Sequence, residues 1–145
     1  MQLLAISDLH LSQTSNKEAL IKMADHRDDW LIIGGDTSEK PELHEFAFKE
    51  LSKRFGRLIW VPGNHDLWTF DSKSKYAKRG VEKYNMLVEI ARSFGVITPE
   101  DPFLEWPVKS GNDAESLFIA PLFLLYDYSF RPKSVDRNNV KNWVR

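Results

Sequence analysis

An apolar segment gives way abruptly to polar residues in the stretch LIWVPGNHD, residues 58–66. The apolar part is short and continuous, which is typical of a strand that is buried on both faces of a parallel sheet. The same pattern occurs twice earlier in the chain, where LLAI at 3–6 precedes SDLH and WLII at 30–33 precedes GGDT. The sequence therefore predicts three strands that each end in ligand-type residues.

Helical segments are predicted between and after these strands. Residues 15–18, SNKE, have the pattern of a capping box that begins a helix. Pro41 suits the first position of a second helix, in which apolar residues recur up to Phe55 before Gly56 ends it. A third helical stretch covers about 75–94, strands follow at 104–108 and 117–125 around a turn at 111–112, and 129–142 is predicted to be a loop. The order predicts an α/β fold in which βαβ units feed a mostly parallel sheet.

Length and composition favour a single soluble domain over residues 1–145. The net charge of -1 gives no long-range attraction to nucleic acid or to an anionic membrane. Cysteine is absent, which excludes disulfides, thiolate metal sites and a cysteine nucleophile. The first residues lack the cationic start of a secretory signal, and the apolar run at 117–126 is too short to span a bilayer. We expect a cytoplasmic protein without a membrane partner.

Polar residues at the strand ends are the candidates for chemistry, because ligands of open α/β sheets bind at the carboxyl ends of the strands. If the three strands are neighbours, six side chains converge on one rim: Asp8, His10, Asp36, Asn64, His65 and Asp66. Carboxylate and amide oxygens with an imidazole suit divalent Mn, Fe, Zn or Co. Two such ions can hold a phosphate and activate a water.

The three strand-end motifs resemble the first sequence blocks of the calcineurin-like metallophosphoesterases, which are D-x-H, G-D and G-N-H-[DE]. The resemblance implies half of a four-layer α/β/β/α sandwich and metal-dependent hydrolysis of a phosphate mono- or diester. It implies that Asp8 and His10 bind a first metal ion, that Asp36 bridges two ions, and that Asn64 binds the second ion. Manganese is the expected metal in vitro.

The remaining two residues of the third motif would serve catalysis rather than metal binding. By the same resemblance, His65 protonates the leaving group and Asp66 orients His65 and raises its basicity. The expected substrate is a phosphate ester, and nucleic acid is expected only as a substrate.

The later blocks of the family, a single histidine and G-H-x-H, are absent, because no histidine follows His65. The second metal ion then has only Asp36 and Asn64. We therefore expect a domain that is incomplete at its carboxyl end, with self-association or a second chain as ways to complete the site. A catalytically inactive scaffold and a truncated fragment stay open as alternatives.

Other polar and aromatic residues receive plainer predictions. His26 and His44 are expected to be solvated or capping, and Trp60 to lie in the core. Trp68 and Phe70 fit a substrate pocket and ordinary packing equally well. A basic group is predicted to form a solvated helix face, with attraction of an anionic substrate as the alternative: Lys73, Lys75, Lys78 and Arg79. A second polar group is predicted to lie near the site: Tyr126, Asp127, Tyr128 and Arg131.

Overall fold

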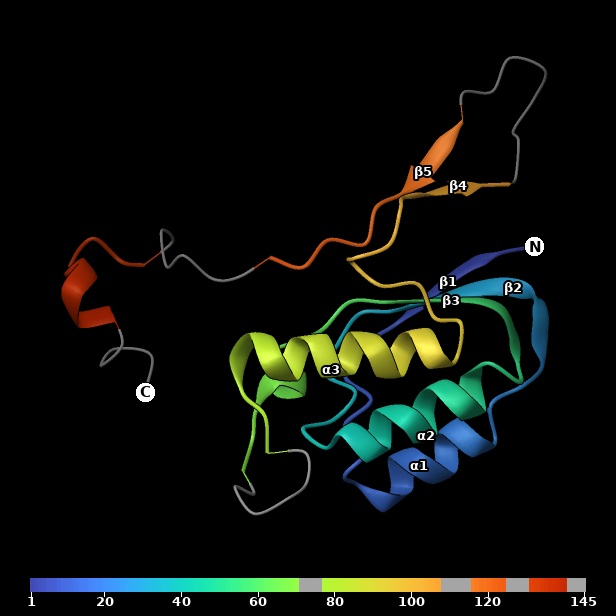
Figure 1. Cartoon of the computed structure of the whole chain (residues 1–145), viewed down its shortest axis with the longest axis horizontal. Coiled ribbons are helices and arrows are strands. Elements are labelled where there is room, and N and C mark those ends of the chain that lie inside the picture. The colour runs from blue at the N-terminus through green and yellow to red at the C-terminus, as the bar shows by residue number, and fades with distance from the viewer. Residues whose placement is uncertain (71–76, 108–115, 125–130, 141–145) are drawn as a thin grey trace.

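A parallel sheet of three strands forms the centre of the protein, shown by a computed structural model that describes residues 1–70, 77–107, 116–124 and 131–140. The strands are β1 (Leu3–Ile6), β2 (His26–Ile33) and β3 (Phe55–Trp60), in the spatial order β1-β2-β3. Both pairs are parallel, with Ile6 opposite Ile33 and Ile33 opposite Trp60. The predicted α/β fold with a parallel sheet is confirmed (Figure 1).

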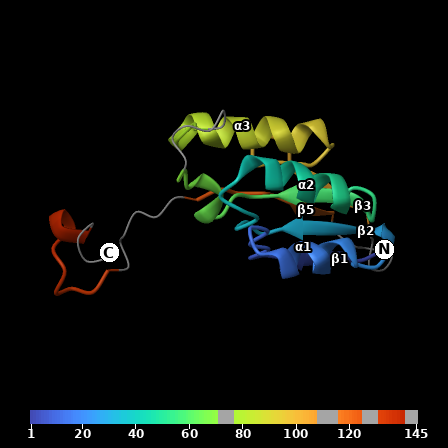
Figure 2. The same ribbon diagram turned by 90° about the horizontal axis from the view of Figure 1, so that it is seen from below.

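Three helices lie side by side along one face of this sheet (Figures 1 and 2). They are α1 (Thr14–Ile21), α2 (Pro41–Leu51) and α3 (Gly80–Ser93). The core lies between the helices and the sheet and includes Leu31, Ile33, Phe48, Leu51, Trp60 and Leu87. Its position explains why Trp60 is buried, as predicted.

The opposite face of the sheet is only partly covered by the described residues. All of Leu58, Ile59 and Trp60 are buried, so the prediction of a strand buried on both faces is confirmed for β3. It is wrong for β1, where Leu3 and Ala5 are exposed. The two strands β4 (Leu104–Trp106) and β5 (Leu117–Ile119) form an antiparallel pair. Trp106 meets Trp30 edge-on at 5.1 Å between ring centroids.

Several predicted element ends are corrected by the structure. The capping box is wrong, because α1 begins at Thr14 and the Ser15 hydroxyl donates to the side chain of Asn16. The second helix ends at Leu51, since Phe55 instead opens β3, pairs with His26 and stacks on its ring at 5.3 Å.

The predicted strands at 104–108 and 117–125 are confirmed in shorter form. The predicted loop after residue 129 contains a short 3-10 helix, η2 (Arg137–Asn139). Arg131 donates to the carbonyl of Val135 within the segment 131–140, which lies apart from the sheet in Figure 1. Predictions for Lys73, Lys75, Tyr126, Asp127, Tyr128 and the 111–112 turn fall outside the described residues. None of the helices in the described ranges has the length and apolar character that crossing a membrane requires.

Candidate metal centre

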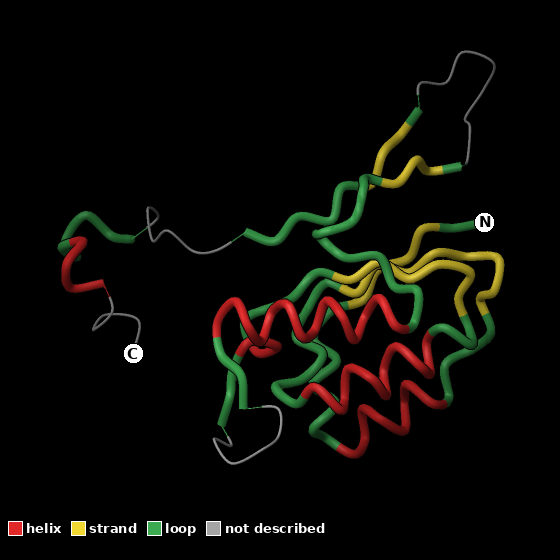
Figure 3. Tube along the Cα trace, in the orientation of Figure 1, coloured by secondary structure: helices red, strands yellow, loops and turns green. Residues whose placement is uncertain are grey.

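The loops that follow β1 and β2 run together at the carboxyl edge of the sheet (Figure 3). The backbone N–H of Asp8 donates to the Gly35 carbonyl at 3.2 Å, and that of His10 to the Asp36 carbonyl at 3.0 Å. Asp8, His10 and Asp36 all have left-handed backbones, with φ of 56°, 42° and 53°. Such a conformation costs roughly 1–2 kcal/mol per non-glycine residue and is concentrated at functional sites. The strain lies at the three residues whose side chains face one another.

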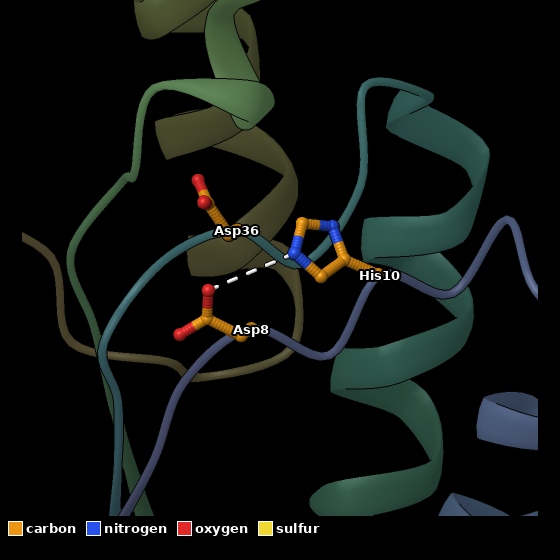
Figure 4. Close-up of side chains that lie close together, drawn as sticks. All are labelled: Asp8, His10 and Asp36. Carbon is orange, nitrogen blue, oxygen red and sulfur yellow. Dashed lines mark ion pairs between the residues drawn. The ribbon is translucent and has the colours of Figure 1, made fainter.

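The side chains of these three residues form one cluster, shown in Figure 4. One ligand atom from each of Asp8, His10 and Asp36 lies within 4.8 Å of the others. Asp8 Oδ1 is 3.6 Å from His10 Nε2, and Asp8 Oδ2 accepts from the Ser7 hydroxyl at 2.6 Å. Two carboxylates and an imidazole are a donor set that fits a divalent transition metal. Asp8 is exposed, so ligands from solvent or substrate can reach such an ion.

Asp36 also contacts the loop that follows β3. Its Oδ1 accepts from the backbone N–H of His65 at 3.0 Å. Glycine is required at this contact, because a Cβ at Gly63 would lie 2.1 Å from Asp36 Oδ1 and one at Gly35 would lie 2.3 Å from the Gly63 nitrogen. The predicted convergence of the second and third strand ends is therefore confirmed, and Asn64 lines the same cavity as Asp36.

The imidazole of His65 lies beside the metal cluster, at the start of the 3-10 helix η1 (His65–Leu67). Its ring centroid is 4.9 Å from that of His10, and the two rings meet edge to face. On its other side it contacts Trp68, with ring centroids 3.7 Å apart. His65 is half-buried and sits next to the candidate ligands without belonging to their cluster.

Comparison with known proteins agrees with this geometry. The sequence model of the calcineurin-like phosphoesterases matches residues 1–142. The chain belongs to the calcineurin-like phosphoesterase family. Among curated members, it is 40% identical over 133 residues to the acyl-carrier-protein phosphodiesterase PptH of Mycobacterium tuberculosis. That match covers 91% of this chain and 40% of the relative, so the chain spans less than half the length of that phosphoesterase.

A solved structure shows the same fold. The crystal structure of phosphopantetheinyl hydrolase (PptH) from Mycobacterium tuberculosis superposes with a TM-score of 0.85 at 37% sequence identity. The superposition covers 99% of this chain and 50% of that chain. The α/β arrangement found here is thus the metallophosphoesterase fold, over about half of that structure.

In this member of the phosphoesterase family, Asp66 connects two of the loops around the candidate metal site. Its side chain is fully buried. Oδ2 accepts from the backbone N–H groups of Asp36 and Gly63 at 3.0 and 2.8 Å, and Oδ1 accepts from that of Ser38 at 3.1 Å. These hydrogen bonds hold the Asp66 carboxylate against the backbone of Asp36. The resemblance implied a different role, in which Asp66 orients His65.

His44 lies directly behind Asp66, and its prediction as solvated or capping is wrong. The side chain is fully buried in α2, with Nε2 at 3.0 Å from Asp66 Oδ1 and Nδ1 at 3.2 Å from the Lys40 carbonyl. Both ring nitrogens of His44 thus face acceptors. When both nitrogens carry hydrogen, the ring forms an ion pair with the Asp66 carboxylate. The missed signal was helical spacing, because Ala47, Phe48 and Leu51 follow His44 at i+3, i+4 and i+7 and are all buried.

His26 is also paired, although its ring is half-buried. Nδ1 lies 3.0 Å from Asp29 Oδ2, and this hydrogen bond is the main cause that lowers the pKa of Asp29. The ring stacks on Phe55 within the sheet. His26 therefore has a structural role in β2, and its ring, 35% exposed, fits the predicted solvated position only in part.

Lys83 is a buried cation that the sequence analysis did not single out. Only 1% of its surface is exposed, and Nζ donates to the carbonyls of Glu39, at 2.8 Å, and Trp68. Burial lowers the pKa of the amine, opposed by the negative charges of Asp66 and Glu39. Its spacing of four from Leu87 and eight from Ala91 was the available signal. Through the Trp68 carbonyl, Lys83 fixes the residue whose indole covers His65.

Proposed function

We propose that this chain supplies a dinuclear metal site that hydrolyses a phosphate mono- or diester. In the proposal, Asp8 and His10 would hold one divalent ion, Asn64 would hold the second, and Asp36 would serve both. The observation that carries it is the cluster of Asp8, His10 and Asp36 ligand atoms within 4.8 Å, with the His65 ring 4.9 Å from that of His10. A metal site with an adjacent unliganded imidazole combines an electrophile with a proton donor.

The roles of the protein groups follow from their positions. When bound, the metal pair supplies positive charge for the phosphate oxygens and acidifies a water molecule. Asp36 is held for this task by the His65 and Asp66 contacts described above. The His65 imidazole carries the proton that the leaving oxygen receives, and the Trp68 indole shields one face of that ring from water.

Similarity to PptH refines the proposal to phosphodiesters. That protein is named an acyl-carrier-protein phosphodiesterase and a phosphopantetheinyl hydrolase. A phosphopantetheinyl ester on a carrier protein is therefore the first natural substrate to test here. We expect manganese to support activity in vitro. Self-association or a second chain is one way to add ligands to the ion assigned to Asp36 and Asn64.

The decisive experiment is hydrolysis of bis-p-nitrophenyl phosphate with added Mn²⁺, against a chelator control. Calorimetric titration of Mn²⁺ in the same samples reports metal binding separately. We expect chelator-sensitive turnover and Mn²⁺ binding, both lost in Asp36→Asn and both kept in Asp25→Asn. Asp25 is a suitable control because it is an exposed carboxylate paired with Arg27.

Each other outcome has a definite meaning. Folded protein that binds no Mn²⁺ contradicts the metal site. Mn²⁺ binding without turnover of either the model substrate or the carrier-protein ester favours the inactive scaffold that the sequence left open.

A further inference from the structure

A cavity of approximately 410 Å³ opens beside the metal cluster. At one end it is lined by Asp36 and Asn64, which the proposed function assigns to metal binding. Away from these polar residues the lining includes Leu67, Trp68, Phe123 and Leu124, which are all apolar. We call this apolar part the Trp68 pocket. If a phosphodiester binds at the metal site, one of its ester groups can extend into this pocket.

The walls of the Trp68 pocket are fixed from two sides. Trp68 contacts the His65 ring, and its carbonyl accepts from Lys83. Phe123 stacks on Tyr84 of α3, with ring centroids 5.4 Å apart. Tyr84 is itself held, because its hydroxyl donates to Glu100 at 2.7 Å. Segments far apart in the sequence thus hold two aromatic side chains around one apolar space.

Apolar surface in the pocket is open to a ligand. Trp68 is 41% exposed and Leu124 is 81% exposed. An exposed apolar surface next to a reactive centre is stabilised when a ligand covers it. The cavity volume falls within the range of about 300–1,000 Å³ that small-molecule sites have.

Charge restricts what the pocket accepts. Among the described residues that line it, Asp36 is the sole charged side chain, and its charge is assigned to metal. A neighbouring cavity shares Leu67 and Trp68 with it, and the cation there is Arg79. An ester group with additional negative charges would therefore meet apolar walls and no lysine or arginine in the described lining.

From this arrangement we infer that the Trp68 pocket binds one ester group of a phosphodiester, and that this group is uncharged and largely apolar. The inference rests on the proposed function and narrows its substrate class. It disfavours nucleic acid and nucleoside polyphosphates, whose arms carry further phosphates. Selectivity would come from burial of the arm against Trp68, Phe123 and Leu124, while the metal site binds the phosphate.

Three phosphonates that resist hydrolysis test this binding without turnover. Calorimetry on the Mn²⁺-loaded full chain compares methylphosphonate, hexylphosphonate and 6-phosphonohexanoate. We expect hexylphosphonate to bind about tenfold more tightly than methylphosphonate, because its chain covers apolar surface. The carboxylate of 6-phosphonohexanoate should remove most of this gain, because its charge loses water without gaining a partner.

Two matched variants locate the effect. Leu124→Ser should reduce the affinity ratio of hexylphosphonate to methylphosphonate from about tenfold to about twofold. Leu117→Ser should keep the ratio, since Leu117 is also strongly exposed, at 63%, but belongs to β5 and is not part of the pocket lining. Both side chains are strongly exposed, so neither substitution should unfold the protein.

The outcomes separate this inference from the proposed function. Failure of Mn²⁺ or methylphosphonate to bind overturns both together. Binding of all three phosphonates with equal affinity overturns the pocket alone. An unchanged ratio in Leu124→Ser combined with a changed sedimentation coefficient shows that Leu124 contacts another copy of the chain, which also overturns the pocket.

Discussion

His44 Nε2 lies 3.0 Å from Asp66 Oδ1, and neither side chain is exposed. Asp66 in turn accepts the backbone N–H groups of Asp36, Ser38 and Gly63. A residue of α2 therefore supports the loops around the candidate metal site through its contact with Asp66. This relationship makes the stability of the helix layer and the geometry of the site depend on the same buried contact.

Replacement of His44 should destabilise the protein. We expect His44→Ala to lower the free energy of unfolding by about 3 kcal/mol, because it leaves the buried Asp66 carboxylate without its imidazole partner. His44→Gln should recover part of the loss, since an amide can still donate to Asp66. Urea denaturation followed by tryptophan fluorescence measures both. His26→Ala is the control and should cost less, because the pair of His26 with Asp29 is partly exposed; equal losses would contradict the assignment.

Replacement of Asp66 should weaken metal binding. In Asp66→Asn, one carboxylate oxygen becomes an NH₂ group, which cannot accept, so either the backbone N–H of Ser38 or those of Asp36 and Gly63 lose their acceptor. With Asp36 less firmly held, we expect Mn²⁺ affinity to fall about 10- to 100-fold, as measured by calorimetry.

Asp101→Asn provides the matched control for this substitution. Asp101 also accepts a backbone N–H, from Thr98 at 2.8 Å, but does not belong to the cluster of Asp8, His10 and Asp36. The Asp101→Asn protein should be less stable than wild type and keep the Mn²⁺ affinity of wild type. The same decrease in affinity for both variants would show a general effect of lost stability and would contradict the positioning role of Asp66.

Much of this site could be predicted from the sequence, because parallel strands place their carboxyl ends at one edge of a sheet. Once the apolar runs at 3–6, 30–33 and 58–61 were taken as neighbouring strands, the residues after them had to converge. The cluster of Asp8, His10 and Asp36 confirms that inference. The left-handed backbones of these residues could not be predicted, because they result from hydrogen bonds between loops distant in sequence.

The buried contacts of His44 and Lys83, which support the loops around the site, could not be predicted in the same way. Polar side chains are mostly exposed, so His44 and Lys83 were not expected on the buried faces of their helices. Each is buried because its partner comes from a distant loop: Asp66 for His44, and the Trp68 carbonyl for Lys83. Sequence spacing could place both residues on a buried helix face, but only the fold identifies the acceptors that make their burial favourable.

The contact between Gly63 and Asp36 should not tolerate a methyl group. In Gly63→Ala, the new Cβ would lie 2.1 Å from Asp36 Oδ1, so the loop or the carboxylate must move. We expect Mn²⁺ binding to be lost or greatly weakened, as measured by calorimetry. Gly80→Ala separates this clash from simple backbone strain: Gly80 has φ of 55° but no atom within 4 Å of the added Cβ. It should cost about 1 kcal/mol of stability and leave Mn²⁺ affinity intact; a similar loss of affinity in both variants would contradict the clash.

Lys83 should make stability depend on pH at the alkaline end. Burial lowers the pKa of its amine below the ordinary value of 10.5. Between the two pKa values the unfolded chain binds more protons than the folded chain, so this group makes stability rise with pH there. The difference in unfolding free energy between wild type and Lys83→Met should thus grow as pH rises toward 10.5 and be flat at lower pH. Denaturation at several pH values measures it, with Lys49→Met, at an exposed position of α2, as the control; a difference that is flat throughout contradicts the buried amine.

Finally, the position of His65 predicts how its loss depends on the leaving group. An alkoxide needs a proton as it departs, whereas p-nitrophenolate leaves without one, so a general acid matters far more for the alkyl ester. We expect His65→Ala to lower kcat/KM about 10²- to 10⁴-fold for a diester with an alkyl leaving group, and much less for bis-p-nitrophenyl phosphate. Mn²⁺ affinity should be retained, because His65 lies beside the ligand cluster and not within it. Equal losses for the two substrates, or a parallel loss of metal, would assign His65 to binding instead of proton transfer.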